Sequence, residues 1–236
     1  MEYLEFERIL SAKRMQRYKD AANGDTRKAM ALYRYNLRLS QEMFTIVSCF
    51  EVALRNAIDS LLIPTLGENW LKDSVQVNGI FTNGIFTNGR MNETRKIIEK
   101  ACSRLDRQGI YSHSKLIAEM EFGVWKYMYS SLQYRATGQC LLRAFPNKPR
   151  SSATAQYNNA YIFNELDKVN SLRNRIAHHE PICFRLHASE IDTSYIVNEY
   201  QKIQTLFSWM GIDSRSMLYG LDHVQNVCTK INSLKE

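Results

Sequence analysis

The feature that most constrains the fold is a long stretch, residues 26 to 63, that contains neither glycine nor proline. Apolar residues recur in it at three- and four-residue steps, the spacing that places side chains on one face of an α-helix. The stretch therefore predicts one long helix, or two helices joined near Ser40. Pro64 and Gly67 are expected to end it.

Helical spacing also covers most of the remaining chain. Ser11 is a candidate N-cap that divides the first of these patterns. No stretch has the composition of a domain linker, and strands have little room. We therefore predict a single all-α domain over residues 1–236, a helical bundle that the C-terminal helices complete or whose interface they cover. The further helical patterns are residues 2–22, 91–108, about 114–134, 162–179, 189–210 and 214–234.

Residues 68–90 break the helical pattern and predict one irregular loop. Asn78-Gly79-Ile80-Phe81-Thr82 is repeated directly as Asn83-Gly84-Ile85-Phe86-Thr87. Asn-Gly pairs favour tight turns, so the duplication predicts either a small hairpin or an exposed loop. Neither alternative indicates catalysis, because no ionisable residue lies between Asp73 and Arg90.

Composition limits the class of protein further. The longest apolar runs are shorter than the eighteen or so residues of a membrane span, and the first twenty residues mix acidic and basic side chains. We expect a cytoplasmic protein without a membrane partner. The net charge of +7 favours a polyanionic partner or serves solubility alone. Five dispersed cysteines do not indicate a disulfide framework and are expected to be buried apolar groups.

The segment from Ser171 to Ile182 holds the densest set of reactive side chains. Its helical pattern has two faces, one apolar and predicted to be buried, the other polar and predicted to point outward. Pro181 should end the helix near His179, which places His178 in the last turn, where the helix dipole favours a protonated imidazole. Arg173 lies about one and a half turns earlier, so its side chain and that of His178 could converge on one phosphate. The apolar face comprises Ile162, Leu166, Val169, Leu172 and Ile176; the polar face comprises Asp167, Ser171, Asn174 and His178.

Arg173-Asn174-Arg175-Ile176-Ala177-His178 resembles the R-x4-6-H motif of HEPN ribonucleases. Residues 172–182 resemble the corresponding segment of the Abi-like (abortive infection) branch of that superfamily. With further blocks, the resemblance covers roughly residues 3 to 185 and implies a HEPN-type helical bundle. The further blocks are residues 23–25, 32–36, 50–58, 118–125 and 144–146.

The resemblance implies a metal-independent endoribonuclease of a phage-defence or toxin type. His178 would be the general acid or base, Arg173 would stabilise charge on the phosphorane, and Asn174 would orient the imidazole or the phosphate. One motif per chain implies a homodimer that builds a composite site. RNA is the expected substrate, an inhibitory RNA or antitoxin protein a possible partner, and no cofactor is expected.

Other residues are predicted to support this site. His179 should lie nearer the buried face than His178, and Arg175 belongs to the motif itself. Glu51 and Arg55 form either an intrahelical ion pair or a layer behind the catalytic helix. Five basic residues beside aromatic side chains or in the connection around Pro146 and Pro149 are weaker candidates for RNA contacts. They are Lys126, Arg135, Arg143, Lys148 and Arg150.

No metal site is predicted. His179, Cys183 and His187 are spaced four apart, but Pro181 interrupts the helix between them and no fourth ligand is apparent. Two alternatives to the enzyme remain open. The chain could be a catalytically idle RNA- or nucleotide-binding module, or a helical scaffold whose 171–182 face contacts another protein.

Overall fold

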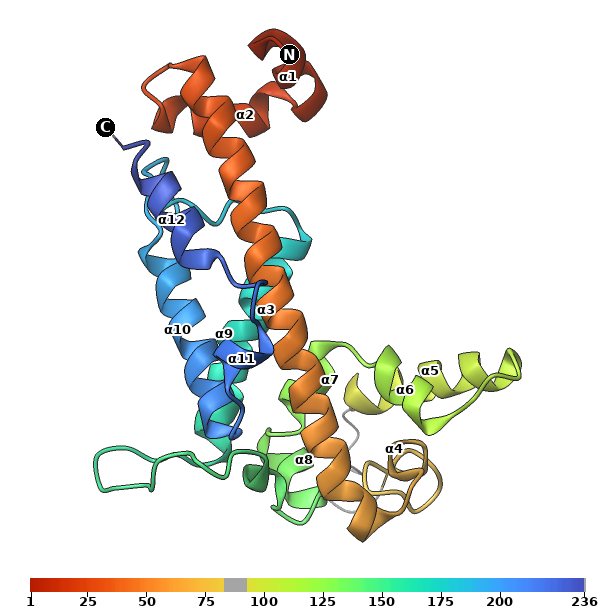
Figure 1. The fold of residues 1–236 in the computed structure, drawn as a ribbon. Coiled ribbons are helices and arrows are strands. Elements are labelled where there is room, and N and C mark those ends of the chain that lie inside the picture. Colours follow the sequence, from red (N-terminus) through yellow and green to blue (C-terminus); the bar gives the residue numbers. More distant parts are fainter. Residues whose placement is uncertain (83–92, 236) are drawn as a thin grey trace. The chain divides into compact units, whose positions relative to one another are not determined.

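The computed structural model describes residues 1–82 and 93–235, and in this part of the chain the fold is all-α (Figure 1). The β-type pairing in the described residues is an isolated antiparallel bridge between Phe184 and Ile191. This agrees with the prediction that strands have little room. None of the described helices combines the length and the apolar content that a bilayer-spanning segment requires. The α-helices are α1 Tyr3–Leu10, α2 Ala12–Ala21, α3 Thr26–Leu66, α4 Trp70–Asp73, α5 Glu93–Arg107, α6 His113–Glu119, α7 Phe122–Tyr127, α8 Ser131–Ala136, α9 Asn159–Ala177, α10 Ser194–Trp209, α11 Ser214–Met217 and α12 Val224–Asn232, with a 3-10 turn η2 at Leu141–Ala144.

The long helix α3 is continuous, so the helical prediction over 26–63 is confirmed, and of its two alternatives the structure has one helix without a joint at Ser40. Pro64 does not end it. Pro64 lacks the N–H that would bond one turn back, yet the helix continues to Leu66. It ends before Gly67, whose φ of 91° lies in the left-handed region that glycine adopts without steric cost.

The chain forms two compact units. The first contains residues 1–48, 171–207 and 213–236, and the second contains residues 49–170 and 208–212. Helices α3, α9 and α10 contribute residues to both units, because boundaries fall inside these helices.

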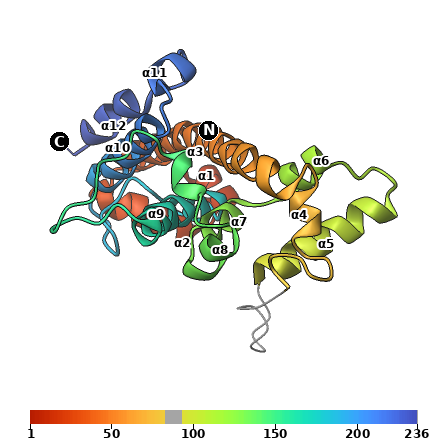
Figure 2. The same cartoon turned by 90° about the horizontal axis from the view of Figure 1, so that it is seen from below.

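In the first unit, α10 and α12 run beside the N-terminal half of α3 (Figures 1 and 2). Their apolar residues are buried at helical spacing, and full burial of one Leu or Ile contributes about 1.5–3 kcal/mol. Polar contacts fix the packing: the buried Glu42 accepts from the backbone N–H of His223 at 3.0 Å. The buried apolar residues include Leu39, Met43 and Ile46 of α3, Ile196, Ile203 and Leu206 of α10, and Val224, Val227 and Ile231 of α12.

In the second unit, α4, α5 and α6 contact one another, and α5 also contacts α7. Asp59 of α3 joins two of these elements, accepting from the Trp70 indole at 2.7 Å and lying 2.8 Å from His113 Nε2. The rings of Phe50 and Phe122 pack with centroids 6.3 Å apart.

Several predicted element boundaries were wrong. Residues 68–90 are not wholly irregular, since α4 buries Trp70 and Leu71 within them. Residues 78–82 form turns, and the second copy of the repeat lies outside the described residues. The single helix expected over 114–134 is three short helices, α6 to α8. The pattern over 214–234 divides into α11 and α12, with Gly220 at a φ of 73° between them.

Candidate functional site at the C-terminal end of helix α9

Helix α9 ends at Ala177, two residues before His179 and therefore near the end that the sequence predicted. Beyond it the backbone N–H of His179 donates to the Ile176 carbonyl at 3.0 Å, and that of Glu180 to the Arg175 carbonyl at 2.9 Å. This pair of bonds, with a φ of 56° at His179, is the Schellman pattern that satisfies the last carbonyls of a helix. The motif therefore lies in a defined helix terminus.

The two faces predicted for α9 are confirmed. The apolar residues are buried, with exposed fractions from 0 to 7 %. The four polar residues of the opposite face are exposed. His178, the candidate general acid or base, thus carries its imidazole on the surface. The buried residues are Ile162, Leu166, Val169, Leu172 and Ile176; the exposed ones are Asp167, Ser171, Asn174 and His178.

His179 does not lie nearer the buried face, as its sequence spacing from Ile176 suggested. It is exposed, because the left-handed conformation at this position turns the chain out of the helix. Helical spacing no longer applies there.

His178 and His179 line a surface pocket of about 380 Å³ in the first unit. Three basic side chains of the N-terminal region line the same pocket, and one carboxylate, that of Glu180, lies among them. The complete lining comprises Ser11, Lys13, Arg14, Arg17, His178, His179, Glu180 and Pro181.

Two arginines of α2 connect this helix to the segment that follows α9. The guanidinium of Arg14 donates through Nη1 to the His179 carbonyl at 2.8 Å. Arg17 donates through Nε to the Ala188 carbonyl at 3.1 Å, and its guanidinium lies 4.6 Å from the centre of the Phe184 ring. These contacts place α2 against the end of the motif.

Arg175 and Asn36 fix the chain directly after the motif. Arg175 lies with Nε 3.2 Å from the Glu180 carboxylate and donates through Nη2 to the Pro181 carbonyl at 3.0 Å. Asn36, a buried residue of α3, accepts from the backbone N–H of Ile182 at 2.8 Å. Arg175 therefore holds the segment that follows the motif through contacts with the backbone and with Glu180. Its support of catalysis stays a prediction.

Arg173 is placed differently from His178. Its Nη1 lies 3.5 Å from Oδ1 of Asn174, and it is not among the residues that line the pocket. Within one chain, Arg173 contacts Asn174, whereas His178 lines a pocket together with the basic side chains of α2. The convergence of Arg173 and His178 on one phosphate remains a prediction.

The remaining predicted residues belong to the second unit. Arg55 is partly buried, and within the described residues its Nε has no hydrogen-bond partner. Glu51 lies one turn before it on α3. Their role behind the catalytic helix stays a prediction, because the site belongs to the first unit.

Lys126 requires a correction. Its side chain is buried, with Nζ 2.7 Å from the Asp167 carboxylate and 4.4 Å from the centre of the Tyr127 ring. A buried, paired ammonium is not available to contact RNA. Arg135, Arg143 and Arg150 are exposed and Lys148 is partly exposed, so these four remain candidates.

The histidines and cysteine spaced four apart are not brought together. Among the residues that the structure describes, no three His, Cys, Asp or Glu side chains form a group that could hold a metal ion. Cys183 is buried, and burial raises the pKa of its thiol to about 12. Cys183 is therefore a protonated core residue at neutral pH.

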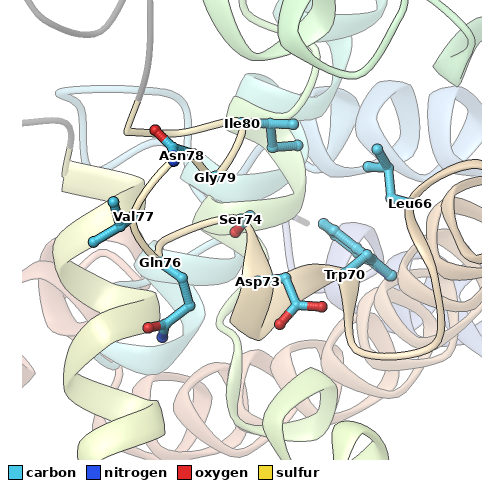
Figure 3. A pocket seen from close by; sticks show the side chains of 9 residues that line it. All are labelled: Leu66, Trp70, Asp73, Ser74, Gln76, Val77, Asn78, Gly79 and Ile80. Atoms are coloured by element: carbon cyan, nitrogen blue, oxygen red, sulfur yellow. The ribbon is translucent and has the colours of Figure 1, made fainter.

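A second pocket, of about 360 Å³, lies in the second unit (Figure 3). Figure 3 shows Leu66, Trp70 and Ile80 on one side of it and Gln76 and Val77 on the other. Asp73 supplies the one ionisable side chain among its described lining residues. This pocket lacks the cluster of charged groups that the first one has.

Sequence reasoning missed Lys13, Arg14, Arg17 and Asn36. The first three are basic residues within one helical turn or so of each other, a signal that could have been noted. Their closeness to His178 could not, because it depends on contacts between residues more than 160 positions apart.

The candidate site is therefore an exposed imidazole in a basic surface pocket, at the C-terminal end of a helix in an all-α fold. The chain belongs to the Abi-like protein family, whose model matches residues 2–183. This confirms the resemblance at the level of the Abi-like family, a name that refers to abortive infection, a form of phage defence. Searches of curated proteins and of solved structures found no match.

Proposed function

We propose that this chain is an endoribonuclease of the HEPN type that acts in phage defence and cleaves RNA without a metal ion. The observation that carries the proposal is the exposed His178 at the end of α9, in a pocket lined by basic side chains and on the helix that bears Arg173 and Asn174. Membership of the Abi-like family supports the biological setting.

RNA supplies the nucleophile of the proposed reaction. A neutral imidazole accepts the proton of the 2′-hydroxyl, and the oxygen attacks the adjacent phosphorus. The P–O5′ bond then breaks, and the leaving oxygen takes a proton from a second, protonated imidazole. The products are a 2′,3′-cyclic phosphate and a 5′-hydroxyl. Guanidinium groups stabilise the negative charge of the phosphorane because their planar donors match two phosphate oxygens.

The proposal takes the second imidazole from a second copy of the motif, and therefore from a second chain. Each chain has one motif, and a two-fold dimer would bring two copies of His178 together across one isologous contact. The exposed polar face of α9 is the expected contact surface. A dimer would also bring Arg173 of one protomer towards His178 of the other, although the two are grouped separately within one chain.

Cleavage of a single-stranded RNA tests the proposal. We expect His178→Ala to lose at least about a hundredfold in rate, the usual contribution of a general acid or base. His187→Ala is the matched control, since His187 is exposed and does not line the pocket. Activity should survive excess chelator, and mass spectrometry should find cyclic phosphate ends. Products with 5′-phosphates, or equal rates for both variants, would refute the mechanism.

Light scattering and growth assays test the remaining parts. We expect a dimer at micromolar concentration, and slower growth of bacteria that express the chain without its RNA or protein inhibitor. His178→Ala should relieve the growth defect and keep the circular dichroism spectrum of the parent. A monomer that still cleaves RNA would separate catalysis from the proposed dimer.

A further inference from the structure

The pocket beside His178 contains more positive charge than the proposed chemistry uses. Lys13, Arg14 and Arg17 of α2 line it, whereas the motif itself contributes only His178 to it. Its single carboxylate, Glu180, is paired with Arg175 at 3.2 Å. The local balance of charge in the pocket is therefore positive.

The three basic residues differ in how many contacts their side chains make with the rest of the protein. Arg17 bonds to backbone carbonyls and packs on Phe184, so its role is structural. Arg14 uses Nη1 for the His179 carbonyl, which leaves its Nη2 and Nε donors. In the described part of the chain no hydrogen bond or ion pair engages the side-chain ammonium of Lys13, which is exposed.

Arg14 also links the pocket to the imidazole. It bonds to the carbonyl of His179, the residue directly after His178, so its position relative to the candidate catalytic group is set by that contact. An ammonium and a guanidinium that border one concave site suit an anion with several oxygens, because each provides charge-assisted hydrogen bonds.

We propose that Lys13 and Arg14 bind a phosphate of the RNA next to the one that is cleaved, and thereby position the scissile bond at His178. This inference rests on the proposed function and assigns to α2 a binding site outside the Arg-x4-His motif. Lys13 binds the phosphate by charge, and Arg14 both binds it and holds the end of α9.

Equilibrium binding of a 2′-O-methylated RNA oligonucleotide tests the site separately from catalysis, because this probe has no free 2′-hydroxyl to attack. We expect Lys13→Gln to weaken binding about fivefold at 0.1 M salt. The negative slope of log affinity against log salt should become less steep by about 0.7. Both values are those for one lost phosphate contact on a single strand. Lys230→Gln is the matched control, since Lys230 is exposed and does not line the pocket. It should keep the parental affinity.

Arg14→Gln should weaken binding at least as much and also lower the melting temperature, since the bond to His179 is lost. Lys13→Gln should leave the melting temperature unchanged, which keeps the test valid if Arg14→Gln fails to fold. An NMR titration with the same oligonucleotide should shift the resonances of Lys13 and His178 together.

The two proposals fail in different ways. If the parent binds the oligonucleotide and Lys13→Gln weakens that binding, but RNA is never cleaved, the phosphate site stands and the nuclease assignment falls. If the parent cleaves RNA and Lys13→Gln matches Lys230→Gln in affinity, salt slope and cleavage at limiting RNA, the phosphate site is refuted and the nuclease assignment stands.

Discussion

At the scale of single residues, a buried tyrosine belongs to α2, the helix whose basic residues line the candidate pocket. Tyr18 is fully buried, and its ring packs against Tyr33 and Phe184 with centroids 5.1 Å away in each case. Within the described residues its hydroxyl has no hydrogen-bond partner. Burial raises the pKa of Tyr18 above its usual range, as it does for the neighbouring Cys183.

Tyr18→Phe removes a hydroxyl whose burial is not compensated by a hydrogen bond. We expect the free energy of unfolding to stay the same or to rise by up to about 1 kcal/mol, because an unpaired buried hydroxyl is unfavourable. Urea denaturation at pH 7 measures it. A loss of more than about 1 kcal/mol would mean that the hydroxyl is bonded after all.

The buried thiol of Cys183 should lower the free energy of unfolding at alkaline pH. Its pKa is about 12 when folded and near the ordinary 9.0 when unfolded. Below pH 9 both states keep the proton and pH has no effect through this group. From pH 9 to about 12 the unfolded state loses the proton first, so the free energy of unfolding falls.

Cys183→Ala should remove this contribution, leaving a shallower decline from pH 9 upward, although the small cavity lowers its stability at pH 7. The measurement is urea denaturation at several pH values for parent and variant. Parallel curves for the two proteins would contradict the expectation.

At the scale of secondary-structure elements, the end of α9 determines how the motif is presented. His179 occupies the left-handed position of the Schellman pattern, where glycine is the favoured residue. The sequence thus has a histidine at a position whose backbone geometry suits a smaller residue.

His179→Gly should raise the free energy of unfolding by about 1 kcal/mol, because glycine adopts this conformation without a clash at Cβ. His179→Val should lower it by at least as much, since a β-branched residue fits the left-handed region poorly. Thermal denaturation of both variants tests the pair. If both lower the melting temperature, the imidazole itself stabilises the fold.

One contact between α7 and α9 is made by the buried ammonium of Lys126. Asp167→Asn should lower the free energy of unfolding by roughly 1–3 kcal/mol, because it leaves the charge of Lys126 without its counterion. Lys126→Met should cost less, since no charge then stays buried. Chemical denaturation of the two variants gives the comparison, and a larger loss for Lys126→Met would refute the argument.

At the scale of the whole molecule, the two compact units share helices α3, α9 and the end of α10. Residues 48 and 49 divide the units inside α3, and residues 170 and 171 divide them inside α9. Unfolding one unit alone would leave half of each helix without its packing partners, and isolated short helices are marginal in water.

We therefore expect a single cooperative unfolding transition, in keeping with the single domain predicted from the sequence. Calorimetry should give equal calorimetric and van 't Hoff enthalpies, and the transitions in circular dichroism and tryptophan fluorescence should coincide. Trp70 and Trp125 lie in the second unit, so a fluorescence change at a separate temperature would reveal independent unfolding.

The sequence by itself determined the all-α class, the helical character of residues 26–63 and the two faces of α9, whereas the structure decided that α3 is one continuous helix. These follow from local periodicity: Leu166, Val169, Leu172 and Ile176 must share a face once the segment is helical. The Abi-like family was likewise recognisable from residue patterns. Short elements were not, because α4 or α7 spans too few residues to show a period.

Only the tertiary structure decided which side chains surround His178. Lys13 and Arg14 are more than 160 residues away in the chain, and their approach follows from how α2 packs against the end of α9. The burial of Lys126 depends in the same way on Asp167 from another helix. Periodicity specifies the face of a helix, whereas the partner of that face is selected by packing and electrostatic contacts between distant segments, which no local pattern records.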